Sequence, residues 1–139
     1  MRPPPRTVLG FDHGARRIGV AVGQTVTGTA SALATLDARD GVPRWDEVAA
    51  LIDRWQPDLL VVGLPLHMDG TEHARTEAAR RFARRLQGRF RLPVELVDER
   101  LSSWEAEHEG ADHGRGIDAR AARLLLQTWL DQAGGTVRE

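Results

Sequence analysis

The stretch that decides the fold reads Thr7-Val8-Leu9-Gly10-Phe11-Asp12-His13-Gly14-Ala15-Arg16-Arg17-Ile18-Gly19-Val20-Ala21-Val22. Residues 7–12 and 17–23 are rich in β-forming side chains, and the short link between them can only close a tight antiparallel hairpin. A carboxylate at the mouth of a buried strand is costly unless something pairs with it. Asp12 is therefore a candidate metal ligand, catalyst or anchored turn-former.

The rest of the chain predicts an α/β fold built on this hairpin. We expect further strands at 30–36, 58–63 and 92–97 and helices at 44–55, 72–88, 103–109 and 117–132, from their apolar spacing. Strands joined by helical crossovers run parallel. The sequence thus predicts a five-stranded mixed sheet, with three antiparallel strands and then two parallel ones, flanked by helices. One domain spans 1–139, with 1–6 and 133–139 expected to be flexible.

The composition excludes several classes of protein. The chain has 139 residues, a formal net charge of −1 and no cysteine, which excludes disulfides, thiol catalysis and zinc-thiolate sites and fits a reducing compartment. The first residues hold no apolar signal-peptide core, and no apolar run approaches the ~20 residues of a membrane span. We therefore expect a cytoplasmic protein with no membrane contact.

The basic residues are unusual in type and position. All 19 are arginine, and several crowd into residues 75–91. For the composition alone we favour a solvated helix face, because charge runs are usually just solvated. Arginine also suits bidentate contacts with phosphate. The alternative is that the helix face carrying Arg75, Arg81, Arg84 and Arg85 steers a phosphate backbone.

Acidic residues mark three places where an element begins or ends. Asp12 ends the first strand, Asp98 and Glu99 end the fifth, and Asp118 opens the last helix. Ligands of open α/β sheets bind outside the carboxyl ends of the strands, and carboxylates converging there need a cation such as Mg²⁺ or Mn²⁺. Each acid also has a structural explanation. These are an Asx-turn at Asp12, a helix cap at Asp118 and pairing of Asp98 and Glu99 with Arg100.

Four segments of the chain resemble the YqgF (RuvX) family, in the family's order. They are Phe11-Asp12-His13-Gly14 with Arg17 to Val22, Val61-Val62-Gly63-Leu64-Pro65-Leu66-His67-Met68-Asp69-Gly70, Val97-Asp98-Glu99-Arg100-Leu101-Ser102-Ser103, and Ile117-Asp118-Ala119-Arg120-Ala121-Ala122. The resemblance implies an RNase H-like fold and a metal-dependent nuclease. Members are described as Holliday junction resolvases and as the nuclease that matures the 5′ end of 16S ribosomal RNA.

The resemblance also implies roles for single residues. Asp12, Glu99 and Asp118 would bind the catalytic Mg²⁺ or Mn²⁺. Asp98 is a close fourth, because the sequence does not show which of the two neighbouring acids faces the metal. The implied or expected substrate contacts are Arg16, Arg17, Arg100, Ser102, Arg84 and Arg85. Family members commonly carry lysines shortly before the third acid, where this chain has residues 110–116 with one arginine, which weakens a phosphate clamp there.

The expected function is metal-dependent maturation of the 5′ end of pre-16S rRNA. The expected partner is structured RNA, either the precursor itself or a ribosomal particle. The alternatives are a Holliday junction resolvase acting on a four-way DNA junction, and a non-catalytic nucleic-acid adaptor. The protein is expected to be a monomer or a homodimer, and a resolvase would need the dimer to cut two strands symmetrically.

Two other side chains have competing interpretations. His13 is expected to fill a turn position, with a proton shuttle or metal ligand as the alternative. Trp104 is expected to pack in the protein, with stacking on a base as the alternative.

Overall fold

The computed structural model describes residues 4, 6–101 and 118–137, the last five of these by their backbone alone. The elements in chain order are β1 (Thr7–His13), β2 (Arg17–Gln24), β3 (Thr29–Arg39), β4 (Val42–Pro43), α1 (Trp45–Trp55), β5 (Leu59–Leu64), α2 (Ala74–Phe90), β6 (Val94–Asp98), the 3₁₀ helix η1 (Glu99–Leu101) and α4 (Ala119–Val137). The helix expected at 103–109 lies outside the described residues. None of the helices within that described part is long and apolar enough to cross a bilayer.

The sheet has six strands in the order β4-β3-β2-β1-β5-β6. The pairs from β1 to β4 are antiparallel, whereas β1–β5 and β5–β6 are parallel. The prediction of five strands is therefore wrong by one. Residues 37–43, which lie between the strand expected at 30–36 and the helix expected from 44, continue β3 to Arg39 and return as β4 through Asp40 and Gly41, which both have positive φ. Asp-Gly is a favoured two-residue hairpin turn.

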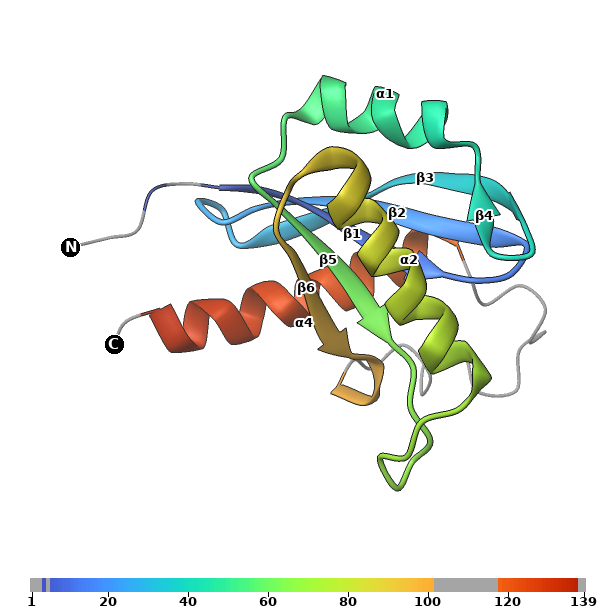
Figure 1. Ribbon diagram of the computed structural model, residues 1–139. Helices are drawn as coiled ribbons and strands as arrows, with labels where there is room; N and C mark the ends of the chain where they lie inside the picture. Colours follow the sequence, from blue (N-terminus) through green and yellow to red (C-terminus); the bar gives the residue numbers. More distant parts are fainter. Residues whose placement is uncertain (1–3, 5, 102–117, 138–139) are drawn as a thin grey trace.

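The two faces of the sheet carry separate cores. Alternation along β1 places Leu9 and Phe11 in the core beneath α1 and α2 and Val8 in the core beneath α4. Figure 1 shows α1 and α2 on one side of the sheet and α4 on the other. Asp12 has the same parity as Val8, so its carboxylate belongs to the α4 face.

Glycines let α4 lie close to the sheet. A Cβ atom at Gly10 or Gly23 would meet the side chain of Leu126 at 3.0–3.1 Å, and one at Gly63 would meet Leu125 at 2.6 Å. Larger residues at these positions would push the helix away. The glycines thus fix the depth of α4 on the sheet.

Helix boundaries differ from those expected. The helix expected from residue 72 begins at Ala74 as α2, and the side chain of His73 caps it, because its Nδ1 accepts the Arg75 N–H at 3.2 Å. Gly88 lies inside the helix, which ends when Arg91 adopts the left-handed conformation. Likewise α4 continues to Val137, past the end expected at 132.

Candidate active site

Two acidic side chains meet at the carboxyl end of the parallel strands. Asp12 is the penultimate residue of β1 and is 4% exposed, and Glu99 begins η1 directly after β6. The Glu99 carboxylate is close enough to that of Asp12 to raise the pKa of Asp12 through its charge and through hydrogen bonding. Oδ1 of Asp12 is buried and has no hydrogen-bond partner within the described part of the chain, and Oε2 of Glu99 is buried too. This is the edge of the sheet where an α/β fold binds its ligand.

The electrostatics of the pair favour a cation or a shared proton. Burial raises the pKa of Asp12 well above its ordinary value, and the charge of Glu99 and the hydrogen bond with it raise the pKa further. Arg75, at the start of α2, lowers the pKa, and Asp118 makes a smaller contribution that raises it. Two carboxylates this close cannot both stay ionised unless a positive charge joins them.

Strand parity separates Glu99 from its neighbour Asp98. Glu95 and Val97 both face α4, since Trp129 Nε1 donates to Glu95 at 3.0 Å and Val97 packs in the α4 core. Alternation then sends Asp98 to the other face of the sheet, and the 3₁₀ turn begins with Glu99 back on the α4 side. The structure therefore brings Glu99, and not Asp98, to Asp12.

The carboxylate of Asp98 is instead held by Arg100. Arg100 Nη2 lies 2.6 Å from Oδ2 of Asp98, and Arg100 Nε lies 3.1 Å from both oxygens. These hydrogen bonds lower the pKa of Asp98. Arg100 Nη1 also donates to the carbonyl of Met68 at 3.1 Å. Arg100 thus ties the loop after β5 to the turn that carries Glu99.

Asp118 is close to the pair, but its carboxylate points to its own helix. Its Oδ1 accepts the N–H groups of Arg120 and Ala121 at 3.0 and 3.1 Å, and its Oδ2 pairs with Arg120 Nη2 at 3.1 Å. Burial raises the pKa of Asp118, but these hydrogen bonds outweigh burial and the net shift is downward. The helix-cap interpretation of Asp118 is thus confirmed for this state of the protein.

The backbone nevertheless places Asp118 one strand from Asp12. Asp12 and Gly19 are direct cross-strand partners, and the carbonyl oxygen of Asp118 lies over Gly19. No three acidic or imidazole groups within residues 6–101 and 118–132 are arranged to hold a metal ion. Two of the three predicted acids therefore meet, and the third is adjacent but turned to Arg120.

His13 belongs to the opposite face of the sheet. Its ring lies 4.8 Å from that of Phe82, and Nε2 contacts the carbonyl of Gly41 at 2.8 Å, which requires the Nε2-protonated tautomer. Burial lowers the pKa of His13, and nearby arginines, including Arg75, lower it further. His13 is therefore a neutral residue of β1 that anchors the β3–β4 turn, rather than a turn residue itself.

The predicted substrate contacts are dispersed. Arg16 is exposed in the β1–β2 turn and Arg17 begins β2, whereas Arg84 pairs with Glu77 at 3.4 Å and Arg85 is exposed on α2. Ser102 and Trp104 lie outside the described residues.

Arg75 acts on the acidic pair in a way that the sequence did not single out. It is the second residue of α2 and changes the pKa of both Asp12 and His13. The sequence did contain a signal for this role. Arg75 is a cation in the first turn of the helix that follows a parallel strand, and that turn lies at the ligand-binding edge of the sheet.

Comparison with known proteins identifies the family. The family described as "RuvX: Holliday junction resolvase" matches residues 6–132. The chain belongs to the RuvX family. Its relatives include candidate pre-16S rRNA nucleases from Glaesserella parasuis, 52% identical over 91% of this chain and 97% of the relative, and from Nitrosococcus oceani, 55% identical over 92% and 88%.

Solved structures confirm the RNase H-like fold of this RuvX chain. Thermus thermophilus RuvC in complex with a Holliday junction superposes with a TM-score of 0.56 at 17% identity, covering 94% of this chain and 97% of RuvC. The fowlpox virus resolvase superposes with a TM-score of 0.54 at 10% identity, covering 91% and 97%. At these identities the likeness concerns the fold alone.

Proposed function

We propose that this RuvX chain is a divalent-metal-dependent nuclease that hydrolyses phosphodiester bonds during 5′-end maturation of pre-16S rRNA. The observation that carries the proposal is the approach of Glu99 to the buried carboxylate of Asp12, one oxygen of which lacks a partner within the described residues. The names of the relatives at about half identity supply the substrate. Such a precursor places the protein in the bacterial cytoplasm.

The donor set fits a hard cation. Carboxylate oxygens are the ligands that Mg²⁺ and Mn²⁺ prefer, and in this proposal Asp12 and Glu99 hold the ion. Asp118, whose backbone lies over Gly19 and whose carboxylate pairs with Arg120, would be the third ligand of such an ion. A bound Mg²⁺ or Mn²⁺ polarises a phosphoryl oxygen and lowers the pKa of a bound water.

The surrounding residues bind and orient the substrate. Arg75 is close enough to act on the charge of Asp12 and supplies a cation for a phosphate beside the pair. Arg100 positions Glu99 through its bonds to Asp98 and to the loop after β5. The expected contacts of Arg16, Arg17, Ser102, Arg84 and Arg85 with the phosphate backbone stay part of the proposal.

A resolvase is the second candidate, favoured by the description of the matching family. It differs in substrate and in assembly, because symmetric cutting of a junction needs two active sites. An adaptor is disfavoured, since a protein that only binds phosphates gains nothing from a buried pair of acids at its ligand-binding edge.

The test compares two substrates at equal enzyme concentration. Purified protein with Mg²⁺ or Mn²⁺ is incubated with a pre-16S rRNA 5′ fragment and with a four-way DNA junction, and its mass in solution is measured in parallel. We expect the RNA to be cut faster than the junction. Faster resolution of the junction by a dimer would replace the proposed substrate with the resolvase function.

A further inference from the structure

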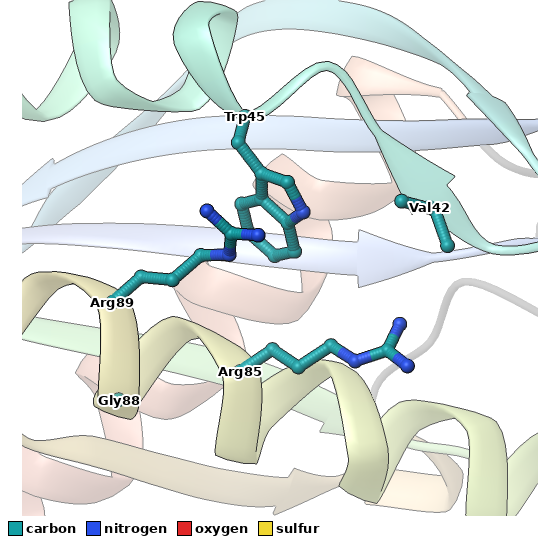
Figure 2. A pocket seen from close by; sticks show the side chains of 5 residues that line it. All are labelled: Val42, Trp45, Arg85, Gly88 and Arg89. Atoms are coloured by element: carbon teal, nitrogen blue, oxygen red, sulfur yellow. The ribbon is translucent and has the colours of Figure 1, made fainter.

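An open pocket lies on the face of the sheet opposite the acidic pair. It has a volume of about 530 Å³ and is lined by Val42, Trp45, Arg85, Gly88 and Arg89. Figure 2 shows Trp45 between the side chains of Arg89 and Val42, with Arg85 extending along the same opening. The size lies within the range of small-molecule pockets. Trp45 packs in the core beneath α1 and α2, so the pocket is separate from the Asp12 site.

The lining offers a flat cation and hydrogen-bond donors. Arg89 Cζ lies 4.4 Å from the centre of the Trp45 ring. The core holds Trp45 in place, because its ring stacks on that of Phe82 with the ring centres 5.9 Å apart and an angle of 18° between the planes. The guanidinium of Arg89 therefore lies over an aromatic ring that the core holds in place, and arginine guanidinium planes are surfaces on which unpaired RNA bases stack.

The charges of the pocket are not neutralised by the protein. Arg85 and Arg89 form no salt bridge or hydrogen bond within residues 6–101 and 118–132, and Trp45 Nε1 donates no hydrogen bond there. By contrast Arg80 and Arg84 of the same helix are paired with Glu72 and Glu77. No carboxylate lines the pocket. The chemistry of this lining suits an anionic occupant with a flat ring and hydrogen-bond acceptors.

We propose that this pocket binds one unpaired nucleotide of an RNA strand, with its base stacked on Arg89 and its phosphate on Arg85. Arg81, Arg85 and Arg89 follow one another at intervals of four residues along α2, so they lie on one face of the helix and the arginine row continues from the pocket toward the start of α2. Arg75, at the site end of α2, and Arg89 are about 20 Å apart along a helix axis. A strand lying along α2 spans both. The biological role rests on the proposed nuclease function, but the binding site does not.

Gly88 provides a variant that blocks the pocket without removing charge. A Cβ atom at Gly88 would meet nothing within 4 Å, so a larger side chain is accommodated on the helix and fills the opening. The second variant is Arg89→Gln. The matched control is Arg54→Gln, which also removes an arginine stacked on a tryptophan, at 5.8 Å from the Trp55 ring.

The experiment measures binding of a short fluorescent single-stranded oligouridylate by anisotropy, in EDTA so that no cleavage occurs. We expect Gly88→Leu and Arg89→Gln to weaken binding about tenfold and Arg54→Gln to leave it within about twofold, since stacking of one base is worth 1–3 kcal/mol. The indole N–H resonance of Trp45, identified with Trp45→Phe, should shift on titration while that of Trp55 stays in place. The oligodeoxyuridylate serves as the DNA comparison and should bind less tightly.

The pocket proposal would be overturned if Gly88→Leu and Arg89→Gln bound the oligouridylate as tightly as wild type, or if the Trp45 resonance did not move. Equal or tighter binding of the DNA strand would overturn the assignment to RNA. The outcome is independent of catalysis. Loss of binding in the pocket variants with no cleavage by wild type would leave the pocket standing and remove the nuclease proposal. Cleavage by wild type together with unchanged binding in the pocket variants would remove the pocket proposal and leave the nuclease proposal standing.

Discussion

The carbonyl oxygen of Asp118 lies directly over Gly19, 2.0 Å from the place where a Cβ atom would be. Gly19 is in turn the cross-strand partner of Asp12. A residue without a side chain is therefore what allows the start of α4 to approach the acidic pair. The relationship links the packing of a helix to the position of the third acid.

Gly19→Ala should displace the start of α4. The new methyl group cannot share space with a backbone carbonyl, so we expect a loss of about 1–3 kcal/mol in unfolding free energy, measured by urea denaturation, together with loss of cleavage. Gly88→Ala is the matched control, because it meets open space in a helix and should stabilise by about 0.5–1 kcal/mol. Equal effects of the two substitutions would contradict the packing described here.

The two neighbouring acids should respond differently to neutralisation. Glu99→Gln removes the group that contacts Asp12, so cleavage should fall by about a hundredfold or more, as expected for loss of a metal-binding carboxylate. Asp98→Asn removes only a partner of Arg100, and cleavage should fall by less than about tenfold. Cleavage rates measured at saturating metal concentration give the effects of both substitutions. A larger loss in Asp98→Asn would show that strand parity assigned the wrong acid.

Asp12 should make stability depend on pH when metal is absent. Its folded pKa is raised, so the native state holds a proton that the unfolded chain releases near the ordinary pKa of 3.8. Stability from this group is complete below that value and is lost as pH rises toward the folded pKa. Asp12→Asn should therefore become increasingly more stable than wild type above about pH 4 in EDTA.

Denaturation midpoints across a pH series give the comparison. Adding Mg²⁺ should raise the midpoint of wild type and leave that of Asp12→Asn unchanged. A difference in midpoint between the two proteins that is the same at every pH would show that burial does not raise the pKa of the Asp12 carboxyl.

His13 should matter for stability and not for proton transfer. His13→Ala removes the contact with Gly41 and the stack on Phe82, so we expect about 2–4 kcal/mol of destabilisation. The pH dependence of the remaining cleavage should keep its shape, measured below the unfolding temperature of the variant. A lost limb of the pH–rate profile would instead support the proton-shuttle alternative.

The sequence predicted the elements whose patterns are local. The hairpin around Asp12 to Arg17 and the apolar run of β5 are recognisable because strand alternation and turn residues act over a few positions. It missed β4, although Asp40-Gly41 is a hairpin signal, because two residues of strand form no pattern of their own. It also took Gly88 as a helix end, since the packing of Phe90 that prolongs α2 is tertiary.

The sequence singled out the acidic residues of the candidate site, but it did not show which of them approach one another. The four acids follow from their positions at element ends and from the family motifs. The choice between Asp98 and Glu99 required knowing which face of β6 meets α4, and the sequence near β6 does not contain the helix that defines that face. The effect of the Arg75 charge on Asp12 and the pocket at Trp45 likewise arise from elements distant in the chain.

The most direct measurement of the central claim is cleavage of a pre-16S rRNA 5′ fragment by wild type and Asp12→Asn, with Mg²⁺ or Mn²⁺ and with EDTA, alongside a binding assay on the same RNA. We predict that wild type cuts only with metal, and that Asp12→Asn binds the RNA at least as well as wild type but does not cut it. Metal-dependent cutting by Asp12→Asn at the wild-type rate would contradict the claim that the buried pair of Asp12 and Glu99 is the catalytic centre.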